Sequence, residues 1–292
     1  MKISGFTIIR NAVMNDYPIV EAIRSILPVV DEMIVLIGDS EDATIALIES
    51  INDSKIKIHH SVWNNNLRTG GSVLAEETNK AFQLIDPESD WAFYIQGDEV
   101  VHEKYHPAIL ADCNNYLADK KVEGLLFNYL HFYGTYDYIG DSRKWYHKEV
   151  RIIRNDKKIQ AYKDAQGFRV GAKAAKIAAK QIDAFVYHYG WVKSPEQMLK
   201  KHKNFSKFWH PDHVIEAGFK EMDFWDFSEF DSLQLFKDTH PLVMQKRIQE
   251  KGWQINIDIT QKKFSFKDKL LYHFEKITGI RPFDFKNYRV LK

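Results

Sequence analysis

The first 121 residues alternate between short apolar runs and segments with helical periodicity. Uninterrupted apolar runs are typical of strands that are covered on both faces, and the segments between them repeat their apolar positions at helical spacing. This alternation predicts βαβ units, right-handed crossovers and a doubly wound, largely parallel sheet. The predicted strands cover residues 2–9, 32–38, 55–60 and 91–95, and the predicted helices cover residues 16–27, 43–51, 71–85 and 107–121.

The pattern changes after residue 121. Three strand-like segments predict a mixed sheet that completes the same α/β domain, and from Ser194 onward helical patterns alternate with aromatic and polar connectors. We therefore expect a domain of residues 1–192 and an α-helical C-terminal extension of residues 193–292. The strand-like segments are 124–134, 149–155 and 184–190, and the helical ones are 194–209, 240–252 and 266–279.

Composition narrows the class of protein. A chain of 292 residues with 45% hydrophobic content can bury a full core. Its formal charge of +1 argues against a nucleic-acid partner, which would need a phosphate-neutralising surface. The single cysteine, Cys113, cannot form an internal disulfide. With neither an apolar signal core nor an uncharged span of about 18 residues, we expect a cytoplasmic protein.

Acidic residues follow the apolar run WAFYI in the stretch WAFYIQGDEVVHE. Asp98 and Glu99 stand where the carboxyl ends of parallel strands open into a ligand crevice. The alternative is a simple turn, because Gly97 and Asp98 are both common turn residues. The surroundings of these residues decide between the two interpretations.

Several short motifs occur in a fixed order along the chain. They are TIIRNA, DEMIV, SEDAT, ETNKA, the QGD of the stretch above and HYGWV. In this order they resemble the family 2 glycosyltransferases of the GT-A fold, and more narrowly the branch of lipopolysaccharide-core and capsule sugar transferases. The resemblance covers roughly residues 3–192. It implies a GT-A-like doubly wound mixed sheet flanked by helices, and transfer of a sugar from a nucleotide-diphosphate donor to a saccharide or lipid-linked glycan.

By the resemblance, a divalent metal bridges the two donor phosphates and stabilises the charge of the leaving group. Asp98 and His188 are its implied ligands, and the metal is Mg²⁺ or Mn²⁺. Arg68, beside two glycines, is open to two interpretations, a diphosphate contact or an exposed arginine before a helix. The full set of expected donor-binding residues is Asn11, Asp39, Asp42, Arg68, Asn79, Gln96 and Asp98.

Inversion at the anomeric carbon requires a general base, and a carboxylate can serve. The resemblance puts Asp164 in that place, with Glu149 as the second choice and a surface or salt-bridge carboxylate as the alternative for both. Trp145 and Arg151 are expected on the acceptor side.

Two positions depart from the family pattern. Gln96 replaces the first aspartate of the aspartate-x-aspartate motif, and an amide binds a cation more weakly than a carboxylate. The acidic residue before the SEDAT turn is displaced to Asp39, which leaves the nucleotide base open. The substitution at Gln96 also supports an alternative function, a domain that binds a sugar nucleotide without turning it over.

Other classes of protein compete with this interpretation. HEKYH (residues 102–106) matches the zinc-peptidase motif, which works only when both histidines lie on one helix, and Pro107 follows it directly. A pyrophosphorylase would need a glycine-rich loop, whereas RNAVMND contains no glycine. The basic, aromatic C-terminal segment is compatible with peripheral membrane contact, without a strong amphipathic pattern. The sequence makes no prediction of oligomeric state.

Overall fold

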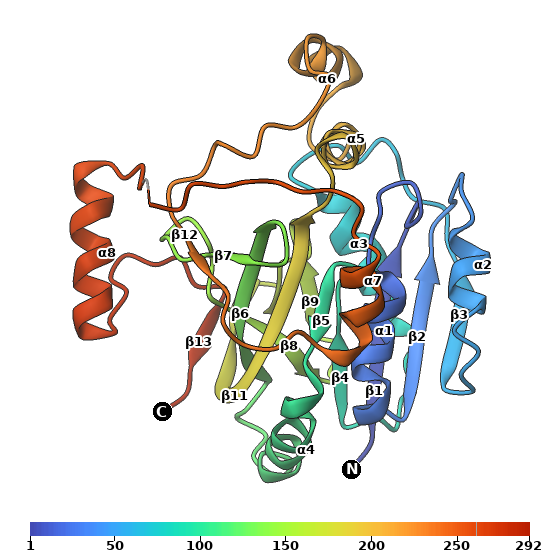
Figure 1. Ribbon diagram of the computed structural model, residues 1–292. Helices are drawn as coiled ribbons and strands as arrows, with labels where there is room; N and C mark the ends of the chain where they lie inside the picture. The colour runs from blue at the N-terminus through green and yellow to red at the C-terminus, as the bar shows by residue number, and fades with distance from the viewer. Residues whose placement is uncertain (261) are drawn as a thin grey trace.

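A mixed β-sheet runs through the centre of the computed structural model, which describes residues 1–260 and 262–292 (Figure 1). Helices cover both faces of this sheet, so the expected GT-A-like doubly wound mixed sheet flanked by helices is confirmed. The strands are β1 (Ile3–Ile9), β2 (Glu32–Ile37), β3 (Ile56–His60), β4 (Trp91–Tyr94), β5 (Glu99–Val101), β6 (Gly124–Gly134), β7 (Tyr138–Gly140), β8 (Lys148–Arg154), β9 (Ile159–Tyr162), β10 (Gly167–Val170), β11 (Ala175–Val192), β12 (Leu233–Leu235) and β13 (Tyr288–Val290).

The strand order along the main path is β3-β2-β1-β4-β8-β6-β11-β10-β9. Strands β1 to β4 pair in parallel, as the βαβ pattern predicts. From β8 onward the pairing is mixed, because β8 lies antiparallel to both β4 and β6 while β6 and β11 are parallel. The carboxyl ends of β1 and β4 therefore lie side by side at one edge of the sheet.

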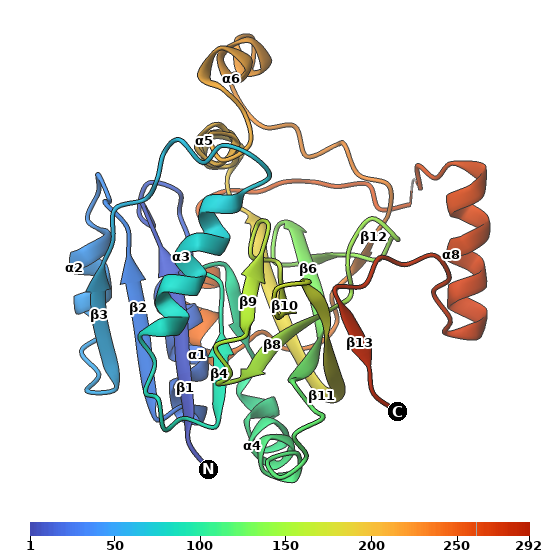
Figure 2. The same ribbon diagram turned by 180° about the vertical axis from the view of Figure 1, so that it is seen from behind.

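Helices form where the apolar positions recur on one face. In α1 the buried residues Ile19, Ile23 and Ile26 follow this spacing and pack on the sheet. Figure 1 shows α1 and α4 on the near face, and Figure 2 shows α3 on the opposite face. The α-helices are α1 (Ile19–Ile26), α2 (Thr44–Glu49), α3 (Ser72–Gln83), α4 (His106–Asn115), α5 (Pro195–Ser206), α6 (Asp212–Phe219), α7 (Gln245–Gln249) and α8 (Phe266–Thr278), and short 3-10 helices cover Leu27–Val29, Glu103–Tyr105 and Leu242–Met244.

Two main apolar cores lie on the two faces of the sheet. One core contains the buried side chains of α1 together with Trp91 and Phe93 of β4. The other contains Phe6 and Tyr94 packed against Phe82 of α3. Because consecutive residues of β4 point to opposite faces, this four-residue strand contributes to both cores. That explains why its sequence is apolar without alternation.

Among the described residues, the segment after residue 192 contains seven of the elements above and long irregular connectors. Strands β12 and β13 join the sheet by pairing with β7 and β11. Helix α5 lies over the carboxyl end of the sheet, and α8 stands at the edge far from α2 and β3 (Figures 1 and 2). The domain boundary near residue 192 stays a prediction. No described helix has the length and apolar character needed to cross a membrane.

Candidate active site

A cavity of about 670 Å³ opens at the carboxyl ends of β1 and β4. This is the edge where ligands bind in open α/β sheets. Its floor includes Ile9, Tyr94 and Gln96, and residues of α5 and the following segment line the other side. Seven of the predicted site residues line it: Asn11, Arg68, Gln96, Asp98, Trp145, Asp164 and His188.

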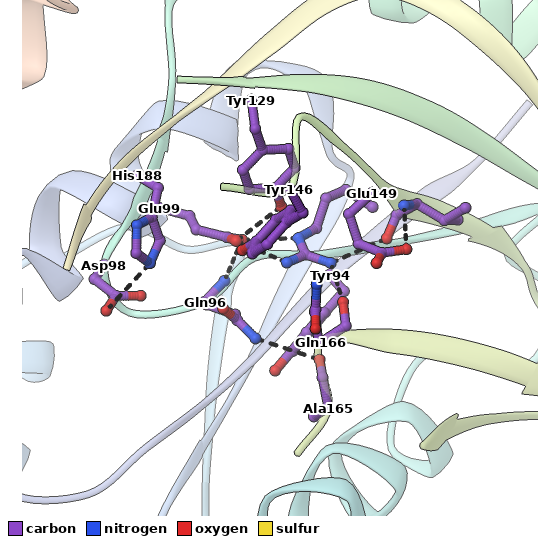
Figure 3. Close-up of polar contacts among 12 residues, drawn as sticks. Tyr94, Gln96, Asp98, Glu99, Tyr129, Tyr146, Glu149, Ala165, Gln166 and His188 are labelled. Carbon is purple, nitrogen blue, oxygen red and sulfur yellow. Dashed lines mark hydrogen bonds and ion pairs between the residues drawn. The ribbon is translucent and has the colours of Figure 1, made fainter. Parts of the chain in front are cut away.

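Asp98 and His188 face each other in this cavity (Figure 3). Asp98 lies in the turn between β4 and β5, and His188 comes from β11, which pairs with β5 so that His188 lies opposite Glu99. The distance from Asp98 Oδ2 to His188 Nε2 is 3.7 Å. The sheet thus brings together two side chains that are 90 positions apart in the sequence.

A chain of hydrogen bonds fixes the tautomer of His188. His131 Nε2 lies 2.6 Å from the carbonyl oxygen of Tyr146, which can only accept, so this nitrogen carries the proton. Burial lowers the pKa of His131 well below its usual value, so His131 is neutral and its Nδ1 is an acceptor. The proton between His131 Nδ1 and His188 Nδ1, 3.3 Å apart, therefore belongs to His188. His188 Nε2 is left with a lone pair on the side of Asp98.

Lys201 of α5 neutralises the Asp98 carboxylate. Its Nζ lies 3.2 Å from Asp98 Oδ2 and donates to the carbonyl of Gly190 at 2.8 Å. Burial alone would raise the pKa of Asp98, but the ammonium groups of Lys201 and Lys193 outweigh it and lower that pKa. Asp98 is therefore ionised at neutral pH although it is largely buried.

The donor set at Asp98 and His188 fits a divalent cation. A carboxylate oxygen and an imidazole lone pair face each other across a gap of 3.7 Å, and two such acceptors are brought together favourably by a shared cation. Gly190 keeps this space open, because a Cβ there would lie 2.6 Å from Asp98 Oδ2 and 2.7 Å from His188 Cε1. Within residues 1–260 and 262–292, no three His, Cys, Asp or Glu side chains group as a metal site. Two protein ligands completed by water and substrate phosphate are usual for Mg²⁺.

Glu99 does not face the cavity but forms a buried ion pair beneath it. Its oxygens accept from Arg151 Nε and Nη2 at 2.8 and 2.7 Å, and both side chains are 0% exposed. Tyr129 Oη and the backbone N–H of Gln96 donate to the same carboxylate. The pair therefore ties the turn that carries Asp98 to β8, and Arg151 does not line the cavity.

The donor side of the cavity is polar and aromatic. Asn11 has a left-handed backbone (φ 53°), and its Oδ1 accepts from the backbone N–H of Glu41 at 2.7 Å. Arg68 Nη1 pairs with Asp212 at 2.6 Å, on the exposed rim. Trp63 is buried below the rim and also lines the cavity.

The two proposed bases lie in different surroundings. Asp164 lines the cavity in the turn after β9, and Gln96 Nε2 donates to the carbonyl of the neighbouring Ala165 at 3.3 Å. Glu149 is buried outside the cavity lining, where its Oε2 accepts from Asn287 Nδ2 at 2.9 Å. Figure 3 shows Glu149 and Asp98 on opposite sides of the Tyr129 and Tyr146 rings. Of the two, only Asp164 lines the cavity.

Five predicted site residues lie outside the cavity lining, and the structure gives each a structural contact. Asp39 pairs with Arg10, and Asp42 accepts from the backbone of Met14 and Thr44 at the start of α2. The side chain of Asn79 on α3 accepts from the backbone N–H of Ala161 at 2.7 Å. The other two are Glu149 and Arg151.

The end of the cavity beside His188 is aromatic, because Trp145 stacks on His131 and His131 contacts the His188 ring. Trp145 and Trp191 line it at right angles to each other with centroids 6.2 Å apart, and His202 stacks on Trp225 at 3.8 Å. These aromatic rings offer flat apolar faces. Lys144 and His202 also line the cavity and add polar groups beside the rings. This end is suited to a sugar ring.

The HEKYH motif does not form a zinc site. His102 is extended (ψ 134°) before the short 3-10 helix, and α4 begins only at His106, so the two imidazoles do not share a helix. His102 Nε2 contacts Thr239 Oγ1, whereas His106 Nε2 contacts the carbonyl of Ser25. His106 is itself helical, because Pro107 occupies a tolerated first-turn position.

Sequence reasoning missed Lys201, His131 and Gly190. Lys201 lies in KKHKNF, a lysine-rich pattern that is typical of a solvated helix face, although its side chain points inward to Asp98. Gly190 lies two residues after the motif histidine in HYGWV, and this glycine is a usable signal in the sequence. Nothing in the local sequence around His131 marks it, because its role depends on the pairing of β6 with β11.

Comparison with known proteins found distant structural similarity. No protein-family model matches the chain, and no curated protein sequence does. S. aureus TarS 1-349 in complex with UDP is similar over 74% of this chain and 69% of that chain, with 15% identity and a TM-score of 0.40. Mycobacterium tuberculosis glucosyl-3-phosphoglycerate synthase in complex with Mn²⁺, UDP and phosphoglyceric acid is similar over 44% of this chain and 43% of that chain, with 19% identity and a TM-score of 0.31.

Proposed function

We propose that this chain is a metal-dependent, inverting glycosyltransferase that moves a sugar from a nucleotide-diphosphate donor to a glycan or lipid-linked acceptor. The observation that carries the proposal is the Asp98–His188 pair at the carboxyl edge of the sheet, with Lys201 beside it. The gap between the two acceptor atoms calls for a cation, and the cavity around it has room for a nucleotide and a sugar. The motif order of the sequence supports the same function.

Each part of the cavity has a role in this proposal. The donor nucleotide lies on the side of Asn11 and Trp63, and its diphosphate lies at Asp98 and His188. Mg²⁺ or Mn²⁺ bound there would neutralise the negative charge that grows on the leaving diphosphate. The ammonium group of Lys201 adds positive charge at the same place.

In the proposed transfer step, Asp164 acts as the general base for the acceptor hydroxyl. The hydroxyl oxygen forms a bond to the anomeric carbon while the bond from that carbon to the phosphate oxygen breaks. The bonding electron pair leaves with the nucleoside diphosphate, and the hydroxyl proton passes to Asp164. Gln96 supports this residue by holding the adjacent Ala165 carbonyl. Trp145 and Trp191 provide faces for the acceptor sugar.

The first experiment measures donor binding and nucleoside-diphosphate release with UDP-, GDP- and CDP-sugars in Mn²⁺. Asp98→Asn should abolish metal-dependent donor binding, because it removes the negative charge of the carboxylate that faces His188. Asp156→Asn, in an exposed turn, is the matched control and should behave as the wild type. Unchanged metal-dependent binding in Asp98→Asn would refute the site. Binding of a donor without any turnover would favour a sugar-nucleotide-binding domain.

The second experiment locates the base. Asp164→Asn should keep donor affinity and lose transfer, because the amide cannot take the acceptor proton. If Glu149→Gln alone produced that result, the base would lie at Glu149 and the assignment of Asp164 would be wrong.

A further inference from the structure

Helix α8 is attached to the rest of the molecule by polar side chains. Tyr272 Oη donates to Asp141 Oδ2 at 2.7 Å, and Arg143 Nη1 donates to Glu275 Oε2 at 2.8 Å. Tyr272 and Glu275 are half-buried and lie three residues apart, so they share one face of the helix. An ordinary surface helix packs its apolar face inward, and α8 does the opposite.

The apolar residues of α8 form an exposed stripe. Phe266 and Ile277 are 86% and 85% exposed, and Leu270 and Phe274 between them are also exposed. Their spacing places all four within one face, opposite Tyr272 and Glu275. We call these four residues the α8 stripe. Beyond the end of the helix at Gly279, the apolar surface continues with the exposed side chains Ile280, Phe283 and Phe285.

Positive charge surrounds this stripe. Residues 262–292 contain nine Lys and Arg against three Asp and Glu, a net charge of +6, whereas the whole chain carries only +1. At about 100° per residue, Lys267 lies on one side of the stripe, and Lys269 and Lys276 lie on the other. All three lysines are exposed. Figures 1 and 2 show α8 at the margin of the molecule, where a flat surface can reach it.

We propose that the α8 stripe and its flanking lysines bind the surface of an anionic lipid bilayer. A helix with an apolar face bordered by lysines lies in the plane of the interface, with its apolar side chains among the acyl chains and its cations near the headgroups. The helix has 13 residues and is about 20 Å long. The charge surplus favours a lipid surface over a second copy of this chain, because two stripes in contact would bring like charges together.

The position of α8 links this contact to the cavity. Arg281, just after the helix, donates to the carbonyl oxygens of Arg143 and Trp145. Trp145 lines the aromatic end of the cavity. Resting on the proposed function, this connection indicates an acceptor that is itself anchored in the lipid. The membrane contact does not depend on catalysis and can be tested separately.

The experiment measures cosedimentation of the full chain with vesicles. Vesicles of phosphatidylethanolamine and phosphatidylglycerol are compared with vesicles of phosphatidylcholine, in the absence of any nucleotide sugar. The wild type should bind the anionic vesicles, and binding should weaken as salt increases. Failure to bind anionic vesicles would overturn the proposal without touching the glycosyltransferase assignment, which depends on Asp98.

Two double variants separate the stripe from general hydrophobicity. Leu270→Ser with Ile277→Ser should reduce vesicle binding at least tenfold, with an unchanged unfolding temperature because both side chains are exposed. The matched control is Val62→Ser with Leu242→Ser, which removes two apolar side chains that are 76% and 71% exposed elsewhere on the surface. Equal loss in both variants, or no loss in either, would overturn the proposal.

Further variants test the contribution of the flanking lysines and the insertion of the α8 stripe into the bilayer separately. Lys269→Gln with Lys276→Gln should weaken binding by about fivefold for each lysine. Because the single native cysteine, Cys113, is buried, Ile277→Cys can carry an environment-sensitive dye whose emission should rise on anionic vesicles. A dimer that the stripe variant abolishes, without any vesicle binding, would assign this face to a second copy and overturn the proposal.

Discussion

The buried pair of Glu99 and Arg151 provides the sharpest test of how the Asp98 turn is held. Arg151→Met removes the guanidinium group and keeps most of the apolar stem. Glu99 then keeps its hydrogen bonds from Tyr129 and from the backbone of Gln96 but loses the cation that compensates its charge. Burial alone would lower the pKa of Arg151, and Glu99 raises it well above its usual value, so the guanidinium group is charged at every accessible pH.

The magnitude follows from the burial of both partners. Removing one member of a fully buried ion pair costs about 3–5 kcal/mol of the free energy of unfolding, because the other charge is left uncompensated. Large domains lose about 2 °C in Tm for each kcal/mol. We therefore expect Arg151→Met to lower Tm by roughly 6–10 °C. Lys104→Met is the control, because the Lys104–Asp238 pair is exposed, and pairs of that kind contribute less than about 1 kcal/mol.

The assay is thermal unfolding followed by circular dichroism, with a double-mutant cycle. Adding Glu99→Gln to Arg151→Met removes both charges of this pair and should restore at least half of the lost stability. A loss below about 2 °C in Arg151→Met, or a double variant no more stable than the single one, would refute the reasoning. If Arg151→Met lost glycosyl transfer while its Tm stayed unchanged, the result would support the expected role of Arg151 in acceptor binding.

Three further predictions concern the surroundings of Asp98. His131→Phe should lower Mn²⁺ affinity about 10–100-fold in calorimetry without donor, because the tautomer of His188 is no longer fixed; affinity equal to the wild type would contradict the hydrogen-bond chain. Gly190→Ala should also lower Mn²⁺ affinity, since its Cβ would meet Asp98 Oδ2 at 2.6 Å, and wild-type affinity would show that the pair can shift. Burial lowers the pKa of Lys193, and the positive charges of Lys201 and Arg247 lower it further. The carboxylates of Asp16 and Asp98 raise this pKa but do not outweigh burial, so that it falls from 10.5 to about 7. Between about pH 7 and pH 10.5 the unfolded chain therefore binds more protons at Lys193 than the folded chain does. The free energy of unfolding of the wild type should then rise with pH, by at most about 1.4 kcal/mol per pH unit, relative to Lys193→Met. If the two proteins gave parallel curves of stability against pH, the lowered pKa of Lys193 would be wrong.

The sequence pattern predicted most of the first half of the fold. Apolar runs and helical periods are local properties, so β1 to β4 and the helices between them appear close to their predicted positions. After residue 121, the sequence pattern predicts only some of the strands that the structure contains. The short strands β7, β9 and β10 were missed, because three or four residues do not show a reliable period. Helix α6 was also missed, and residues 240–252 form only a 3-10 turn and the short α7.

Arg151 and Glu149 show why some site residues could not be placed. They are two positions apart in β8, so simple alternation would put both on one face of the sheet. The register between β6 and β8 shifts at Leu125 and Leu126, which pair with Ile152 and Val150 and leave Arg151 without an opposite residue. Such a bulge reorients the side chain and depends on the partner strand. Local sequence alone does not reveal it.

The sequence by itself determined the order of strands and helices in the first half of the chain, the position of Asp98 at a strand end and the candidate partner His188, because these follow from local periods and motif order. Only the tertiary structure decided which groups face one another. The approach of Lys201 to Asp98, the contact of His131 with His188 and the inward polar face of α8 all join residues from separate elements. Their physical cause is strand register and helix packing, and both are set by contacts between distant parts of the chain.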